Sequence, residues 1–262
     1  MRLKPEFRKF KAFLLDCDGV LWLGGRPIRS ALKAVEGLRE AGREVLYVTN
    51  NSTRSRRGYV RRLRRMGFEA SLSDIFCSSY VTARYLEGRA ERAFVVGEAG
   101  LVEELAARGV EVLGLDPDER ADCVVVGLDR GLTYEKLAVA LAHLRRGALF
   151  VATNRDSTLP SEAGELPGAG AIVAALEEAA GRRVDVEVGK PSPLIFEAVL
   201  KERGLSRDEV LVIGDRLDTD VEGARRAGLA SALVLTGVTK LGDLEGREEP
   251  DYVLRTLLDL FE

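Results

Sequence analysis

Two aspartates that follow a short apolar segment are the first candidates for chemistry. Asp16 and Asp18 come directly after residues 12–15 and precede Gly19. Residues i and i+2 of a strand project to the same face, so both carboxylates are expected to point into one cleft. Because close carboxylates repel each other, one could stay ionised as a nucleophile or ligand while the other transfers protons. The alternative is a solvated turn at a strand end, where Asp and Gly are also common.

A second pair of carboxylates, Asp215 and Asp220, lies in the segment Gly-Asp-Arg-Leu-Asp-Thr-Asp. The chain has one histidine, so its available ligands are hard oxygens, which favour magnesium over zinc. The alternative is that these residues cap a helix that begins near Thr219, a role that Asp218 or Thr219 could fill. Capping does not explain Asp215, which precedes the cap. The sequence therefore predicts a magnesium site that includes Asp215.

A neutral phosphate-binding segment follows another apolar run, at residues 49–52. The hydroxyl of Thr49, the amide of Asn50 and the amino end of the following helix could together hold a phosphate. Helix capping is the alternative, and it is the better explanation for Ser52. Lys190, which Pro191 holds in a fixed turn, could neutralise clustered carboxylates and bind a phosphoryl oxygen.

These side chains need elements that bring them together, and four apolar runs provide them. The runs are Ala12–Leu15, Val45–Val48, Val210–Ile213 and Ala232–Leu235. Runs of this length without alternation are typical of strands buried on both faces of a parallel sheet. Ser30–Ala41 has apolar residues at helical spacing, so the rhythm of strand, helix and strand predicts a doubly wound α/β sheet. Ligands bind beyond the carboxyl ends of such strands, where the candidate residues lie.

The middle of the chain repeats this pattern over the length of a small domain. Its expected strands and helices are Ala93–Val96, Cys123–Gly127, Leu149–Ala152, Ala99–Arg108, Tyr134–Arg146 and Ala171–Ala180. We interpret residues 78–187 as an α/β domain inserted into a core domain of residues 1–77 and 188–262.

Four motifs in this order resemble the haloacid dehalogenase superfamily. They are Asp-Cys-Asp-Gly-Val at residues 16–20, Thr49, Lys190, and Gly-Asp-Arg-Leu-Asp-Thr-Asp at residues 214–220. The resemblance implies a Rossmann-like core, an inserted cap and Mg²⁺-dependent hydrolysis of small phosphate monoesters. It also implies that Asp16 is the nucleophile and that Asp18 handles protons. By the resemblance, Thr49 and Lys190 hold the phosphate, next to the Asn50 amide. The metal is bound by the carboxylates of Asp16 and Asp215 and by the Asp18 carbonyl, with Asp220 nearby, through water or in the outer coordination sphere.

Motif spacing places the inserted domain after the second motif. About 30 residues separate Asp18 from Thr49, which leaves room for one crossover helix, whereas about 140 separate Thr49 from Lys190. This arrangement resembles the C2-capped branch that contains NagD-like, p-nitrophenylphosphatase and phosphoglycolate phosphatase enzymes. By that resemblance the cap residues Asn154, Arg155 and Asp156 would select the substrate, and dimers would form through the cap. A surface loop before the helix at Ala171 is the alternative for these three residues.

The composition of the chain argues against nucleic-acid binding and membrane insertion. A net charge of -3 gives no basic field for nucleic acid, and the arginine-rich residues 54–65 are interpreted as the solvated face of a helix. No apolar run is long enough to span a membrane, the amino end lacks a signal-peptide pattern, and three scattered cysteines suit the cytoplasm. The absence of glutamine and the presence of only three asparagines indicate a thermophilic protein.

Several other functions are compatible with parts of this pattern. A phosphotransferase of the same superfamily is one alternative, and a non-catalytic phosphate-binding protein is another, although the intact set of Asp16, Asp18, Lys190 and Asp215 disfavours the latter. A dehalogenase is disfavoured by Asp18, a mutase by the position of the insertion, and a phospho-accepting signalling domain by the length of the chain. The physiological substrate cannot be read from the sequence, because the cap loops decide it.

Overall fold

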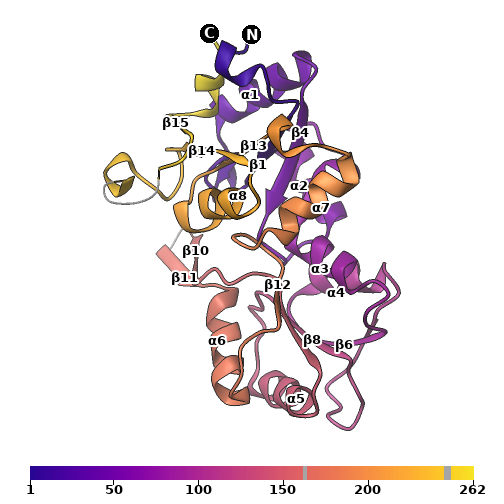
Figure 1. The fold of residues 1–262 in the computed structure, drawn as a ribbon. Helices are drawn as coiled ribbons and strands as arrows, with labels where there is room; N and C mark the ends of the chain where they lie inside the picture. The colour runs from indigo at the N-terminus through magenta and orange to yellow at the C-terminus, as the bar shows by residue number, and fades with distance from the viewer. Residues whose placement is uncertain (162–163, 245–248) are drawn as a thin grey trace. The chain divides into compact units, whose positions relative to one another are not determined.

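The computed structural model describes residues 1–161, 164–244 and 249–262, and Figure 1 shows its elements. The chain divides into two compact units. The first comprises Met1–Thr49, Val60–Phe76 and Lys190–Glu262, and the second comprises Asn50–Tyr59 and Cys77–Gly189.

Residues 50–59 pack with the second unit, whereas the boundaries predicted from the sequence grouped them with the first. The backbone of Arg54 lies so close to Gly100 that a Cβ there would approach it within 2.2 Å. The amide of Arg56 donates to Glu104 Oε1 at 2.6 Å. These contacts between distant segments could not be seen from local composition.

The first unit is built on a six-stranded sheet in the order β15-β14-β13-β1-β4-β5. The strands are β1 (Ala12–Leu15), β4 (Glu44–Thr49), β5 (Ile75–Cys77), β13 (Val210–Gly214), β14 (Ala230–Val234) and β15 (Tyr252–Leu254). Strand β1 pairs in parallel with both β4 and β13, and all four of its residues are buried. In Figure 1 this sheet combines indigo and purple strands from the start of the chain with orange and yellow strands from its end.

Helices and a small hairpin complete this unit. The helices are η1 (Pro5–Phe7), α1 (Arg29–Glu40), η2 (Leu72–Asp74), α7 (Leu194–Arg203), η3 (Arg207–Glu209), η4 (Leu217–Val221), α8 (Glu222–Arg226), η5 (Leu241–Leu244) and η6 (Leu257–Leu260). Helix α2 (Arg56–Arg65) belongs partly to each unit. The hairpin consists of β2 (Trp22–Leu23) and β3 (Arg26–Pro27), which pair antiparallel directly after the first motif.

The second unit has its own five-stranded parallel sheet, in the order β12-β9-β8-β6-β7. Its elements are α3 (Ser78–Leu86), β6 (Arg92–Val96), α4 (Ala99–Ala106), β7 (Glu111–Val112), β8 (Cys123–Val126), α5 (Tyr134–Arg145), β9 (Leu149–Ala152), β10 (Thr158–Ser161), β11 (Gly164–Pro167), α6 (Ala169–Ala180) and β12 (Val186–Glu187). Helices α5 and α6 pack on each other and on β8, and bury a core that includes Phe94, Phe150 and Leu176.

The predicted α/β class with parallel sheets is confirmed. Strands Ala12–Leu15 and Leu149–Ala152 match β1 and β9 exactly as bounded, and the other predicted strands and helices agree within a few residues. The hairpin β10–β11 was not predicted, since all four residues of β11 are exposed and show no apolar alternation. Among the described residues, no helix combines the length and apolar character that crossing a membrane would require.

Candidate active site

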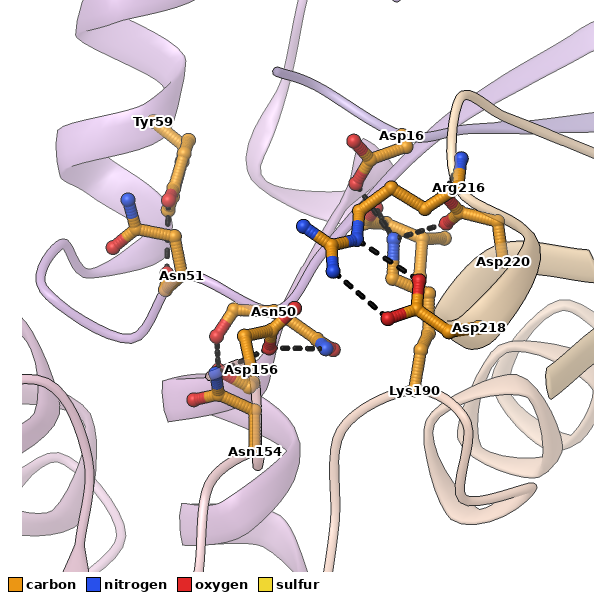
Figure 2. A network of polar contacts seen from close by, with 12 residues as sticks. Asp16, Asn50, Asn51, Tyr59, Asn154, Asp156, Lys190, Arg216, Asp218 and Asp220 are labelled. Carbon is orange, nitrogen blue, oxygen red and sulfur yellow. Dashed lines mark hydrogen bonds and ion pairs between the residues drawn. The ribbon is translucent and has the colours of Figure 1, made fainter. Parts of the chain in front are cut away.

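Lys190 is a buried cation held by carboxylates of the first unit. Its Nζ lies 2.6 Å from Asp16 Oδ1 and 2.6 Å from Asp220 Oδ1, and it donates to the Val48 carbonyl at 3.2 Å. Figure 2 shows both carboxylates directed at this ammonium group. Burial alone would lower the pKa of Lys190, but the charges of Asp16 and Asp220 outweigh it and raise that pKa. Lys190 therefore stays positively charged around neutral pH.

Asp16 lies at the carboxyl end of β1, in the centre of the sheet. Its backbone N–H donates to the Ile213 carbonyl at 2.9 Å, which extends the parallel pairing with β13 by one residue. Burial raises the pKa of Asp16 well above its usual value, and the carboxylates of Asp220 and Asp215 raise it further, while Lys190 opposes them. The Asp16 backbone is thus held by the sheet, and its carboxyl group lies among the charges of Lys190, Asp215 and Asp220.

Three carboxylates converge at this end of the sheet. Asp16, Asp215 and Asp220 each offer an oxygen, and these oxygens all lie within 4.8 Å of one another. Burial raises the pKa of Asp215 to about 7, and the charge of Asp220 adds to this shift. One lysine cannot balance three carboxylates, so the cluster carries excess negative charge when it is fully ionised. Clustered hard oxygen donors with excess charge fit a divalent cation such as Mg²⁺.

The loop after β14 encloses Asp215. The Val238 N–H donates to Asp215 Oδ2 at 2.7 Å, and the Thr239 N–H donates to the Asp215 carbonyl at 3.1 Å. A Cβ on Gly237 would lie 1.9 Å from Asp215 Oδ2, so only glycine allows this approach. The sequence predicted a strand at Ala232–Leu235 but gave no sign that the loop after it holds Asp215.

Asp18 lies in a turn and not in the strand, because β1 ends at Leu15. Strand alternation therefore does not determine how the Asp16 and Asp18 side chains point relative to each other. Gly19 makes the turn possible with a φ of 80°, and the Trp22 indole N–H donates to Asp18 Oδ1 at 2.8 Å. Sequence reasoning missed this role of Trp22, because only the folded turn brings the indole back to Asp18.

Thr49 and Asn50 stand where the chain leaves the first sheet. Thr49 is the last residue of β4 and is buried, and the Asn50 carbonyl accepts a hydrogen bond from Ser78 Oγ at 2.5 Å. The Asn50 side-chain amide donates to Asp156 Oδ2 at 2.8 Å. Asn154 Nδ2 donates to the same oxygen at 2.5 Å. Figure 2 shows the two amides meeting at Asp156, which ties residues of two predicted site segments into one network.

Arg155 is held by a buried carboxylate of α6. Its guanidinium donates twice to Glu177, to Oε1 and Oε2, at 2.8 Å each. Glu177 also accepts from Arg183 at 2.9 Å and from the Val184 N–H at 3.0 Å. The hydrogen bond from Arg155 is the main cause that lowers the pKa of Glu177 to about 2. Arg155 thus has a clear role in holding its loop on α6, whatever else it contacts.

Comparison with known proteins gives a consistent assignment. The family model of haloacid dehalogenase-like hydrolases matches residues 13–111, and a related model matches residues 187–260. Human glycerol-3-phosphate phosphatase is 41% identical over 92% of this chain and 83% of its own length. A 4-nitrophenylphosphatase from Schizosaccharomyces pombe is 35% identical over 99% of this chain and 96% of its own.

Solved structures agree with these relatives. A p-nitrophenyl phosphatase from Archaeoglobus fulgidus superimposes with a TM-score of 0.90 at 38% identity, over 96% of this chain and 98% of that one. Similarity of this extent, together with the carboxylates at the strand ends, settles the family. The chain belongs to the haloacid dehalogenase-like hydrolases, and it is a phosphatase that acts on phosphate monoesters.

Proposed function

We propose that the chain hydrolyses small phosphate monoesters with Mg²⁺ through a covalent phospho-aspartate on Asp16. The observation that carries the proposal is the buried cluster in which Lys190 Nζ lies 2.6 Å from both Asp16 and Asp220, with an oxygen of Asp215 close by. A glycerol phosphate phosphatase from Mycobacterium tuberculosis, 36% identical to this chain, has been solved with magnesium and with calcium. Those structures support a divalent cation in this cluster.

Asp16 is the proposed nucleophile. Its carboxylate must be ionised to attack phosphorus, and the ammonium of Lys190 favours that form although burial opposes it. Asp16, Asp215 and the Asp18 carbonyl would hold Mg²⁺, with Asp220 nearby. The bound ion would neutralise charge on the phosphoryl oxygens.

Asp18 is the proposed acid and base. In the first step its carboxyl gives a proton to the leaving oxygen as the bond between that oxygen and phosphorus breaks. In the second step its carboxylate takes a proton from the water that attacks the phosphoryl group, which frees phosphate and restores Asp16. Thr49, Asn50 and Lys190 are the proposed contacts to the phosphoryl oxygens. A covalent intermediate divides one very slow hydrolysis into two easier displacements.

Small polyol and sugar phosphates are the proposed substrates. Relatives of this chain are glycerol-3-phosphate phosphatases, 4-nitrophenylphosphatases and, at 36% identity, an acid sugar phosphatase from Staphylococcus aureus. The proposal includes the inserted segment as a cap in which Asn154, Arg155 and Asp156 select the substrate. Dimerisation through the cap, a cytoplasmic location and a thermophilic source remain predictions from the sequence.

The test is phosphate release from p-nitrophenyl phosphate, glycerol phosphate and a panel of sugar phosphates. We expect turnover with Mg²⁺, none after EDTA treatment, and none with the Asp16→Asn variant, which should still fold. Asp218→Asn is a matched control, because that carboxylate is 60% exposed and pairs with Arg216. Turnover by Asp16→Asn at the wild-type rate would refute the role of Asp16, and binding of phosphate without turnover would favour a non-catalytic protein.

A further inference from the structure

The turn after the nucleophile folds back on itself and brings an indole to Asp18. The Leu21 and Trp22 amides donate to the Cys17 carbonyl at 2.9 and 3.3 Å, and the Gly19 amide donates to the Trp22 carbonyl at 2.8 Å. In this geometry the Trp22 N–H reaches Asp18 Oδ1 at 2.8 Å. Trp22 is 1% exposed although the next residue, Leu23, is 54% exposed. The indole is therefore turned inward from an exposed hairpin.

Arg62 of α2 contacts this hairpin at its tip and at the indole ring. Its Nη2 donates to the Gly24 carbonyl at the tip of the hairpin at 2.9 Å. Its guanidinium carbon lies 4.7 Å from the centre of the Trp22 ring, within the range of a cation–π contact. All of these residues belong to the first unit. Arg62, Trp22 and Asp18 thus form a continuous chain of contacts that ends on a carboxylate.

The indole fixes which group donates and which accepts in the hydrogen bond between Trp22 and Asp18. An indole nitrogen can only donate a hydrogen bond, so Asp18 Oδ1 must accept in this contact in either protonation state. A carbonyl oxygen accepts a hydrogen bond better than a hydroxyl oxygen, so the other oxygen, Oδ2, is the favoured carrier of the proton that Asp18 transfers. The indole also fixes the rotation of the carboxyl group about its last torsion, which is otherwise broad.

We propose that Trp22 is a positioning residue that holds Asp18 Oδ1 and so directs Oδ2 at the reacting oxygens, with Arg62 fixing Trp22. This inference rests on the proposed function, because it gives Asp18 the role of acid and base. In the first step the Oδ2–H bond breaks, its proton goes to the leaving oxygen, and the pair of electrons stays on Asp18. In the second step Oδ2 takes a proton from the attacking water, and the carboxyl group is restored.

The experiment compares two leaving groups in the Trp22→Phe variant, which keeps an aromatic ring under Arg62 and removes the donor together with the second ring of the indole. p-Nitrophenolate is weakly basic and departs with little protonation, whereas the alkoxide of glycerol phosphate needs a proton as it leaves. The measured quantity is kcat/KM, which reports formation of the covalent intermediate. Because a positioned acid contributes on the order of 10²-fold or more, we expect kcat/KM to fall about tenfold more for glycerol phosphate than for p-nitrophenyl phosphate.

Two further variants distinguish a loss of Asp18 positioning from a general loss of folding or activity. Arg62→Met should shift the ratio of the two kcat/KM values in the same direction by a smaller factor. Tyr47→Phe removes another buried aromatic donor of the first unit, whose Oη donates to the Glu69 carbonyl at 2.8 Å, and it should leave the ratio unchanged. Equal losses for both substrates in Trp22→Phe would overturn the inference. A wild-type protein that hydrolyses neither substrate would overturn the proposed function itself.

A second readout needs no catalysis. Trp22 is the only tryptophan of the chain, so ¹⁵N-labelled protein has one indole N–H signal. Removal of the acceptor by Asp18→Ala should move that signal and speed its exchange with solvent, whereas Asp218→Ala should not. An indole signal that is the same in wild type and Asp18→Ala would show that the contact does not exist in solution.

Discussion

Removal of the buried charge of Asp215 should stabilise the protein when no metal is present. Asp215 is 2% exposed, and burial raises its pKa from 3.8 to about 7. A raised carboxyl pKa means that the folded state binds the proton more tightly than the unfolded state. The free energy of unfolding therefore falls as pH rises from about 4 to about 7. At 1.36 kcal/mol for each pKa unit, the loss above pH 7 amounts to about 4 kcal/mol.

Asp215→Asn avoids this loss, because the amide has nearly the same shape and no charge. Its Oδ1 can still accept from the Val238 N–H, which lies 2.7 Å from the wild-type carboxylate, and the pKa of Asp215 already includes the stronger hydrogen bond that the ionised form accepts. We therefore expect the variant to be more stable than wild type by about 4 kcal/mol at pH 8 in EDTA. The difference should shrink as pH falls below 7 and should nearly disappear at pH 4, close to the pKa of 3.8 in the unfolded state.

Urea denaturation followed by the fluorescence of Trp22 measures this difference between pH 4 and pH 8. Added Mg²⁺ should stabilise wild type by about 2.7 kcal/mol at a hundred times its Kd and should stabilise Asp215→Asn much less. Asp218→Asn, at a carboxylate that is 60% exposed, should change the stability by no more than about 0.5 kcal/mol. If Asp215→Asn is less stable than wild type at pH 8 in EDTA, the electrostatic reasoning is wrong.

Two further substitutions test the buried charges. Lys190→Met should lower the free energy of unfolding by about 3–5 kcal/mol at pH 7 in EDTA, because Asp16 and Asp220 lose the cation 2.6 Å away; an unchanged urea midpoint would contradict this. Glu177→Gln breaks the double contact with Arg155 and should cost about 2 kcal/mol at pH 7. Since the pKa of Glu177 is lowered to about 2, that cost should be complete above pH 4.5 and shrink as pH falls towards 2, which thermal unfolding across pH can measure. A pH-independent cost would mean that packing, and not charge, holds this loop.

The sheet of the first unit could be predicted because its strands are buried on both faces. Apolar runs such as Ala12–Leu15 stop abruptly at polar residues. This pattern follows from burial on both faces and does not depend on how individual side chains pack. Helix α3 was missed because almost all its residues are buried, which removes the periodicity of an amphipathic helix. The two-residue strands β2, β3, β7 and β12 are too short to leave a pattern at all.

For the candidate site, the residues at strand ends could be predicted from the sequence, but the contacts that hold their side chains could not. Carboxyl ends of parallel strands meet at one edge of a sheet, so Asp16 and Asp215 could be placed together from the order of the strands. The contacts that hold side chains in place depend on loops that return from far along the chain. Two such contacts are the hydrogen bond from the Val238 N–H to Asp215 and the one from the Asn50 amide to Asp156. The spacing of residues along the chain does not predict either of them.

The central claim is that Asp16 becomes phosphorylated during turnover. Wild-type protein mixed with p-nitrophenyl phosphate and Mg²⁺, quenched with acid and treated with borohydride, should carry a reduced aspartyl residue in the peptide that contains Asp16. Mass spectrometry of that peptide gives the position directly, and the Asp16→Asn variant should show no such product. Reduction at a different aspartate, or phosphate released from a chiral substrate with inversion at phosphorus, would contradict the account, because two successive displacements retain configuration.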